Sequence, residues 1–188
     1  PEHNVECSAV VACFTRTTKK KVVSVKRIQN VRLWRMYADQ RELVMGKTCN
    51  NGKANEHFLW HGSSTSSAGK GAADIIKKSG FESQFSNCAP AGIWLSTNSV
   101  YSAGGYAEKC PEGSLLFLVR TTLGYISVDD GSGRRPKKIG LEFADSHHCG
   151  ASSTGHKRVD DQEGGGGDNR YVVYNNHQLY PAYIVTFK

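Results

Sequence analysis

The sequence lacks the long apolar run that a membrane-spanning helix needs. No stretch approaches the roughly 18 consecutive apolar residues of such a helix, and the polar start Pro1–Asn4 does not have the pattern of a secretory signal. Because the first residue is not methionine, we expect the sequence to be a fragment of a longer protein. Its 188 residues are enough for one domain with a substantial core, and we expect residues 1–188 to form a single domain.

The six cysteines lack the spacing of a disulfide scaffold. They are scattered along the chain and form no Cys-x-x-Cys pair, which favours a reducing compartment, nuclear or cytoplasmic. One cluster, His147-His148-Cys149 with His156 nearby, contains residue types that bind zinc. It has no second paired half-site, so a polar loop is the favoured interpretation and we expect no metal.

Acidic residues are scarce in the first third of the chain. Residues 1–60 hold 11 lysines and arginines against 5 aspartates and glutamates, whereas residues 61–188 hold 13 against 12. The excess gathers at Lys19-Lys20-Lys21 and Lys26-Arg27, and such a patch can attract nucleic acid or an acidic protein. A solvated hairpin or helix face explains the same pattern and is its more common cause.

The sequence also lacks internal repeats and a regular strand–helix alternation. Many short strands with two or three helices predict an α+β domain. Apolar residues at helical spacing predict helices over Ile28–Met45 and Ala68–Ser79, stopped by Gly46 and Gly80, and a helical turn over Ser99–Ala107. The predicted strands are Val5–Thr17, Lys21–Val25, Phe58–Trp60, Ile93–Leu95, Ser114–Thr122, Tyr171–Tyr174 and Tyr183–Phe187.

Three connections have no regular pattern. A loop is predicted over Phe81–Ala91, and Asn175–Ala182 is predicted to join the last two strands with Pro181 in the turn. Residues 129–169 are polar and glycine-rich, and a long irregular region of this kind is usually functional or mobile.

The apolar stretch Phe58–Trp60 ends abruptly in His61-Gly62-Ser63-Ser64. When a strand ends in a His-Gly pair, the imidazole of the histidine lies beside the backbone amide of the glycine. That amide is not covered by a side chain, because glycine has none. That pairing suits a polar, planar ligand such as a carboxamide. Taken alone, Trp-His-Gly is a weak motif. The simpler explanation is a histidine in the core whose hydrogen bonds are made within the protein.

Four segments give this motif a context. Ile28–Tyr37 precedes Leu59–Ser63, Gly92–Tyr106 follows, and the chain closes with Tyr171–Phe187. In this order they resemble the catalytic domain of the poly(ADP-ribose) polymerase family, the diphtheria-toxin-like ADP-ribosyltransferases. The ending is most similar to the mono-ADP-ribosylating members. The resemblance implies an ADP-ribosyltransferase fold, with split antiparallel or mixed sheets and a few flanking helices, and NAD as the co-substrate.

The resemblance also implies a role for each matching residue. His61 would hydrogen-bond a ribose hydroxyl of NAD. The backbone of Gly62 and the side chain of Ser102 would hold the nicotinamide carboxamide, and Tyr106 would stack on the nicotinamide ring. Residues 81–91 would form the loop over the NAD, and residues 129–169 would form the acceptor side. The implied NAD-binding residues are His61, Gly62, Ser63, Trp94, Ser102 and Tyr106.

Two positions depart from the family's His-Tyr-Glu triad, which here becomes His61, Trp94 and Arg170. Tryptophan keeps an aromatic face but loses the phenol oxygen. Arginine stays protonated and cannot act as the base that a glutamate supplies for chain elongation, so poly-ADP-ribosylation is not expected. Asp168 and Glu163 lie close to Arg170 in the sequence. A shift of register that brings Asp168 to the ribose is an alternative that the strand alignment disfavours.

Three functions therefore stay open. The leading hypothesis is a mono-ADP-ribosyltransferase that modifies an unknown protein acceptor and releases nicotinamide. The second is an NAD-binding or interaction module whose chemistry has lapsed, motivated by Trp94 and Arg170. The third is an ADP-ribosyltransferase that acts on nucleic acid, motivated by the basic first third.

Overall fold

The computed structural model describes residues 2–64, 71–86, 92–128, 138–139, 142–143, 145–150 and 169–188. These ranges contain four α-helices, and none of them combines the length and the apolar character needed to cross a bilayer. The helices are α1 (Glu2–Thr15), α2 (Val31–Met45), α3 (Ala72–Ser79) and α4 (Ser99–Gly105). Three short 3-10 turns are η1 (Thr48–Asn50), η2 (Ser83–Phe85) and η4 (Asn176–Gln178).

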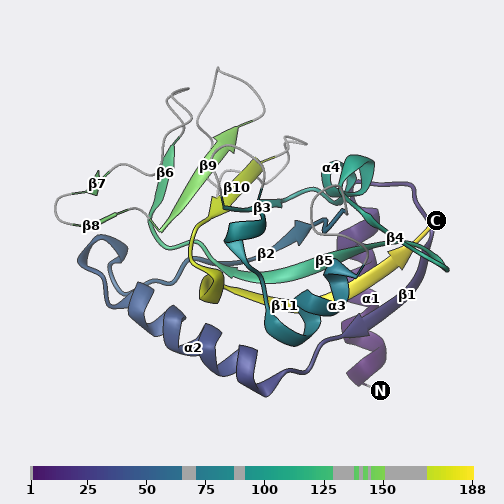
Figure 1. The fold of residues 1–188 in the computed structure, drawn as a ribbon, viewed down its shortest axis with the longest axis horizontal. Coiled ribbons are helices and arrows are strands. Elements are labelled where there is room, and N and C mark those ends of the chain that lie inside the picture. The colour runs from purple at the N-terminus through teal and green to yellow at the C-terminus, as the bar shows by residue number, and fades with distance from the viewer. Residues whose placement is uncertain are drawn as a thin grey trace.

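Most strands of the described chain belong to one sheet with the order β1-β11-β5-β2-β3-β10-β9-β6 (Figure 1). Strand β4 pairs with β5 beside this path, and β7 with β8 forms a separate pair. Every pairing is antiparallel except that of β6 with β9. The first strands are β1 (Val22–Arg27), β2 (Glu56–His61), β3 (Ile93–Ser96), β4 (Glu108–Cys110), β5 (Gly113–Thr122) and β6 (Ile126–Val128). The later strands are β7 (Lys138–Ile139), β8 (Glu142–Phe143), β9 (Ser146–Gly150), β10 (Asn169–Val173) and β11 (Leu179–Phe187).

The sheet is nearly divided between β2 and β3. These strands share a single paired position, Trp60 opposite Ser96, whereas β2 pairs with β5 over six positions. The two halves of the sheet diverge from this point, and the His-Gly pair lies at the divergence. The predicted α+β class with split sheets is confirmed.

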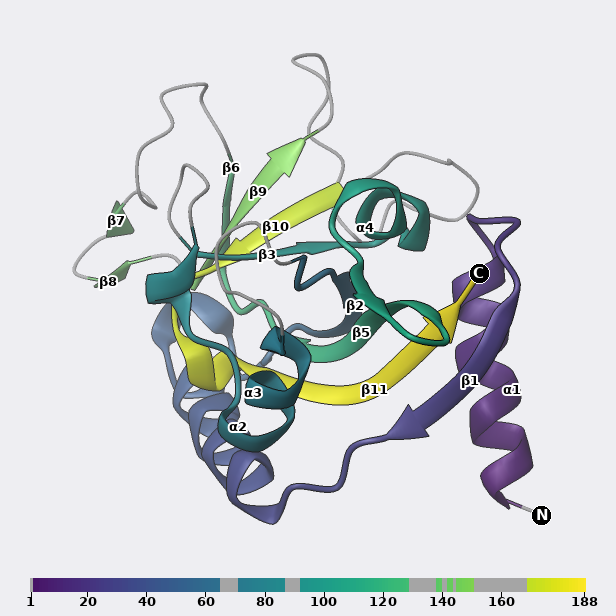
Figure 2. The ribbon, with the colours of Figure 1, turned by 45° about the vertical axis from the view of Figure 1, so that its right-hand side comes forward.

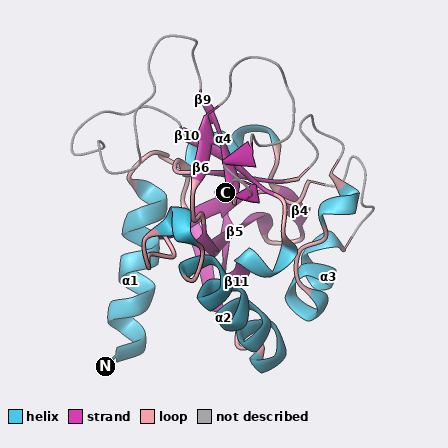
Figure 3. Ribbon diagram, turned by 90° about the vertical axis from the view of Figure 1, so that its left-hand side faces the viewer, coloured by secondary structure: helices cyan, strands magenta, loops and turns pink. Residues whose placement is uncertain are grey.

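Side chains alternate along the central strands and build a core on each face. On β5, Phe117 and Val119 join the core on the α3 side, while Leu116 and Leu118 join the core under α1. Figure 3 shows α1 and α3 on opposite sides of the strands. Both faces of β5 are therefore buried, and the strand lies inside the sheet between β11 and β2.

The helix α1 overturns the prediction of a strand over Val5–Thr17. Its β-branched residues favour a strand locally, but Val10 and Phe14 are four residues apart and lie on one side of a helix. Phe14 packs edge-on against Trp60 with ring centroids 5.5 Å apart. Burial of a short apolar stripe on the sheet therefore outweighs the local preference.

The ending of the chain also differs from the prediction. Pro181 lies inside β11 and not in a turn, since the connection after β10 is the shorter η4. The ladder between β11 and β5 shifts register between Pro181 and Tyr183. A bulge of this kind accommodates a residue that has no N–H to donate to the ladder.

Other predicted elements are confirmed with shifted ends. The helix over Ile28–Met45 begins at Val31, because Asn30 caps it by accepting the Leu33 N–H at 3.1 Å. The strands β1, β3 and β10 and the helix α4 lie where strands and a helical turn were predicted. Residues 68–70 of the predicted second helix and 87–91 of the predicted loop lie outside the described residues.

Candidate active site

The last residue of β2 is His61, and its imidazole is held by the neighbouring strand. Leu59 and Trp60 are buried in the cores on opposite faces of the sheet and fix β2 up to this point. The His61 Nδ1–H donates to the Trp94 carbonyl at 2.8 Å. The ring also packs edge-on against Phe81, with centroids 5.1 Å apart. The histidine is thus oriented by a strand that is far away in sequence.

These contacts fix the protonation of His61. A backbone carbonyl only accepts hydrogen bonds, so the proton lies on Nδ1 and Nε2 carries a lone pair. Burial lowers the pKa of His61, and the hydrogen bond to the Trp94 carbonyl opposes this effect only in part. The imidazole is therefore neutral near pH 7 and can accept a hydrogen bond from a hydroxyl group through Nε2.

The residue after His61 must be glycine because the backbone of Tyr106 passes against it. A Cβ at Gly62 would lie 2.3 Å from the Tyr106 carbonyl oxygen and 2.6 Å from the Tyr106 Cβ. The Ser64 N–H donates to the same carbonyl at 2.8 Å. The structure thus brings Gly62 and Tyr106, 44 positions apart in the printed sequence, into direct contact.

Ser102 locks α4 onto the end of β2. It is buried, and its hydroxyl donates to the Trp60 carbonyl at 3.3 Å, while its own carbonyl accepts the Tyr106 N–H at 3.2 Å. The hydroxyl oxygen keeps lone pairs that can accept from a ligand. Among the predicted site residues, the structure therefore brings His61, Gly62, Ser102 and Tyr106 together.

Trp94 and Arg170 lie on adjacent strands. Trp94 is opposite Val172, and Arg170 is opposite Ser96, so both side chains stand on the same face of the β3–β10 pair. The Arg170 guanidinium lies over the ring of Tyr101 in α4, 5.1 Å from its centroid. Figure 2 shows α4 beside the ends of these two strands.

Ser63 makes a contact that the sequence analysis did not foresee. Its hydroxyl donates to Glu108 Oε2 at 2.9 Å, and the same oxygen accepts the Ala73 N–H at 2.9 Å. Glu108 is buried in β4 and links the residue after Gly62 to the first turn of α3. The role of Glu108 could not be predicted from the sequence, because β4 has only three residues and Ser63 lies 45 positions away from Glu108.

A family model described as the poly(ADP-ribose) polymerase catalytic domain matches residues 6–188. The chain belongs to this family. The mouse protein named protein mono-ADP-ribosyltransferase PARP12 is 24% identical over 171 residues, which cover 88% of this chain and 21% of that protein. A Dictyostelium discoideum protein named probable poly [ADP-ribose] polymerase is 24% identical over 180 residues, covering 93% of this chain and 46% of its own length. The chain thus spans less than half the length of each of these curated relatives.

Membership in the poly(ADP-ribose) polymerase family confirms the predicted resemblance, and the domains of this family use NAD as their co-substrate. The roles assigned to individual residues stay predictions. Asp168 and Glu163, the alternative carboxylates, lie outside the described residues. Arg170 lies inside β10, which begins at Asn169 and not at Tyr171 as predicted.

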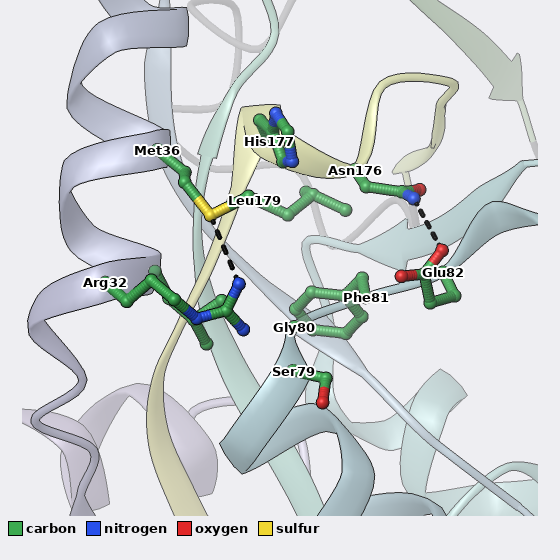
Figure 4. A pocket seen from close by; sticks show the side chains of 10 residues that line it. Arg32, Met36, Ser79, Gly80, Phe81, Glu82, Asn176, His177 and Leu179 are labelled. Carbon is green, nitrogen blue, oxygen red and sulfur yellow. Dashed lines mark hydrogen bonds between the residues drawn. The ribbon is translucent and has the colours of Figure 1, made fainter.

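A small cavity lies near His61, on the far side of Phe81. Figure 4 shows it between α2, the C-terminal end of α3 and η4, with Phe81 and Leu179 among its lining residues. The Asn176 side-chain amide donates to Glu82 Oε2 at 3.0 Å on its rim. Its volume of about 100 Å³ is too small for a dinucleotide. Phe81 lines the cavity and also packs against the imidazole of His61, so it lies between the two.

The residues 146–150 form the strand β9 and not the polar loop that was predicted. His148 is buried, packs against Tyr171 with centroids 5.2 Å apart, and pairs with Asn169 through Nε2 at 3.3 Å. Within the described residues, no three His, Cys, Asp or Glu side chains gather as a metal site would require. His156 lies outside those residues.

Proposed function

We propose that this domain transfers single ADP-ribose units from NAD to a protein acceptor and releases nicotinamide. The observation that carries the proposal is the contact of Gly62 with Tyr106 at the end of β2, beside the neutral imidazole of His61. A backbone segment that carries no side chain, an aromatic ring and a hydrogen-bond acceptor are groups that would suit the nicotinamide riboside part of NAD. The family membership supports the same co-substrate.

In the proposed reaction, the bond between C1′ of the ribose and the nicotinamide nitrogen breaks, and its electron pair leaves with nicotinamide. A lone pair of the acceptor forms the new bond to C1′, and a neutral acceptor then releases its proton to water. His61 Nε2 would accept a hydrogen bond from a ribose hydroxyl. The backbone of Gly62 and the Ser102 oxygen would orient the carboxamide, and Tyr106 would stack on the ring.

The proposal of single units follows from Arg170. Its guanidinium stays protonated, so it cannot accept the proton of a ribose hydroxyl that would extend a chain. The printed name of the mouse relative as a mono-ADP-ribosyltransferase agrees with this choice. The acceptor would come from the nucleus or the cytoplasm, in line with the scattered spacing of the cysteines in the sequence.

The test is nicotinamide release from NAD by the wild-type domain, His61→Ala and His57→Ala. His57 is the matched control, since it lies on the same strand and its Nε2 pairs with Asn55 at 2.7 Å. We expect His61→Ala to lose at least tenfold in rate and His57→Ala to keep it. Equal rates in all three proteins would contradict the assigned site.

A lapsed enzyme is the second candidate, favoured by the same arginine in place of a catalytic carboxylate. Calorimetry with NAD separates the two candidates. Tight binding of NAD with no nicotinamide release over several acceptors would identify a module that binds NAD without using it.

A nucleic-acid acceptor or an acidic partner is the third candidate. It is favoured by Lys19, Lys20 and Lys21, which are exposed in the turn between α1 and β1. Binding of RNA or DNA by these lysines should weaken steeply as salt rises. Binding that is absent or independent of salt would remove this candidate.

A further inference from the structure

Arg170 ends a stack of three side chains that begins at the nicotinamide-binding backbone. Its guanidinium lies 5.1 Å from the centroid of Tyr101. The Tyr101 ring lies against that of Tyr106, with centroids 5.2 Å apart and planes inclined by 35°, and their hydroxyls are 3.4 Å apart. The arginine comes from β10, and both tyrosines come from α4 and its C-terminal cap.

The other end of the stack is fixed to the His-Gly segment. The Tyr106 carbonyl accepts the Ser64 N–H at 2.8 Å and lies against Gly62. The Tyr106 side chain is 43% exposed, so burial alone does not hold its ring. The contact with Tyr101 restrains the exposed ring, and Tyr101 is in turn restrained by the cation above it.

We propose that Arg170 is a positioning residue that orders Tyr101 and Tyr106 for stacking on nicotinamide. The inference rests on the proposed function and gives Arg170 a task other than that of a base. The face of an aromatic ring is negative and attracts a cation, whereas it repels a carboxylate. Arg170→Glu would therefore loosen Tyr106 and would not restore the chemistry of the family's glutamate.

Two variants separate this task from a general effect of charge. Arg170→Met keeps an unbranched side chain in β10 and removes the cation. Arg120→Met is the matched control, because Arg120 lies over Phe58 at 5.2 Å on the opposite half of the sheet. Both variants lose one positive charge and cation–π stabilisation. Arg120→Met also removes a contact with Trp34 at 5.6 Å and an ion pair with Glu56 at 3.7 Å, so it is the larger perturbation of the two. Only Arg170→Met touches the stack.

The experiment combines two measurements on the same proteins. Fluorine NMR of 3-fluorotyrosine placed at position 106 reports the order of the ring without any ligand. Calorimetry with nicotinamide reports the binding that the ring supports. Thermal melts establish that each variant is folded before either measurement.

We expect Arg170→Met to broaden or shift the fluorine resonance and to weaken nicotinamide binding about five- to thirtyfold. This range corresponds to about 1 to 2 kcal/mol for a partly desolvated cation–π contact, at tenfold per 1.4 kcal/mol. Arg120→Met should change neither quantity.

Three outcomes would count against the two proposals in different ways. An unchanged resonance and unchanged affinity in Arg170→Met would overturn the positioning role. Tighter nicotinamide binding or chain elongation by Arg170→Glu would overturn it as well. Wild-type protein that binds no nicotinamide would contradict the proposed function, and the fluorine comparison would still decide whether Arg170 orders Tyr106.

Discussion

Substitution of Gly62 by alanine is the sharpest perturbation that the structure offers. The added Cβ would lie 2.3, 2.5 and 2.6 Å from the carbonyl oxygen, the carbonyl carbon and the Cβ of Tyr106. Carbon atoms prefer separations of about 3.5 to 4.0 Å, so the backbone of Tyr106 would have to retreat by about 1 Å. The 2.8 Å hydrogen bond from Ser64 to Tyr106 would be lost or lengthened by that movement.

Overpacking of this kind costs about 1 to 3 kcal/mol. In a chain of this size, each kcal/mol lowers the melting temperature by about 2 to 4 °C, so we expect a decrease of roughly 2 to 12 °C for Gly62→Ala. The displaced Tyr106 can no longer stack in register with the backbone of residue 62. We therefore also expect nicotinamide binding to weaken by at least tenfold.

Gly104→Ala is the matched control. A Cβ at Gly104 in α4 would meet nothing within 4 Å, and alanine favours a helix by up to about 1 kcal/mol. This variant should keep its affinity and melt at the same temperature or slightly higher. Calorimetry and thermal melts on the two variants test these expectations. If Gly62→Ala bound nicotinamide as tightly as Gly104→Ala, the contact between residue 62 and Tyr106 would not be needed for binding.

Two further predictions concern His61 and Glu108. Because burial lowers the pKa of His61 in the folded state, the unfolded chain binds a proton more readily than the folded protein does. The contribution of His61 to the free energy of unfolding should therefore be fully present above about pH 6.5, the ordinary pKa of histidine, and should fall as the pH drops below this value. NMR titration of the ring and thermal melts at several pH values would check this. Glu108→Ala leaves the Ser63 and Ala73 donors without their acceptor and should lower the free energy of unfolding by about 1 to 3 kcal/mol for each buried donor. Glu108→Gln keeps an oxygen that can accept both hydrogen bonds and should be more stable. Equal urea midpoints for the two variants would contradict this.

Local patterns of the sequence were enough to predict the elements that carry the site. The apolar strand into His61, the buried strand at residues 114–122 and the helix ending before Gly46 all have a short-range signature, and all three are observed. That Gly62 and Tyr106 belong to one site was implied only by the family resemblance, and their direct contact was not predicted. Its cause, the close approach of two backbones, is visible only in three dimensions.

The wrong predictions share a physical reason. The helix α1 is stabilised by the burial of Val10 and Phe14 on a sheet that is formed later in the chain, and no local propensity contains that information. The contacts of Glu108, for which no prediction was made, also could not be found from local propensity, because its partners lie 45 and 35 positions away. The contact of Arg170 with Tyr101 depends likewise on the docking of α4 beside β10.

The proposed function requires that this domain uses NAD and transfers one ADP-ribose unit at a time. Intact-protein mass spectrometry of the domain and of added acceptor proteins, after incubation with NAD, tests it most directly. We expect mass increases of one ADP-ribose per modified site, which are lost in His61→Ala and kept in His57→Ala. A ladder of longer chains on single sites, or unmodified protein under every condition, would contradict it.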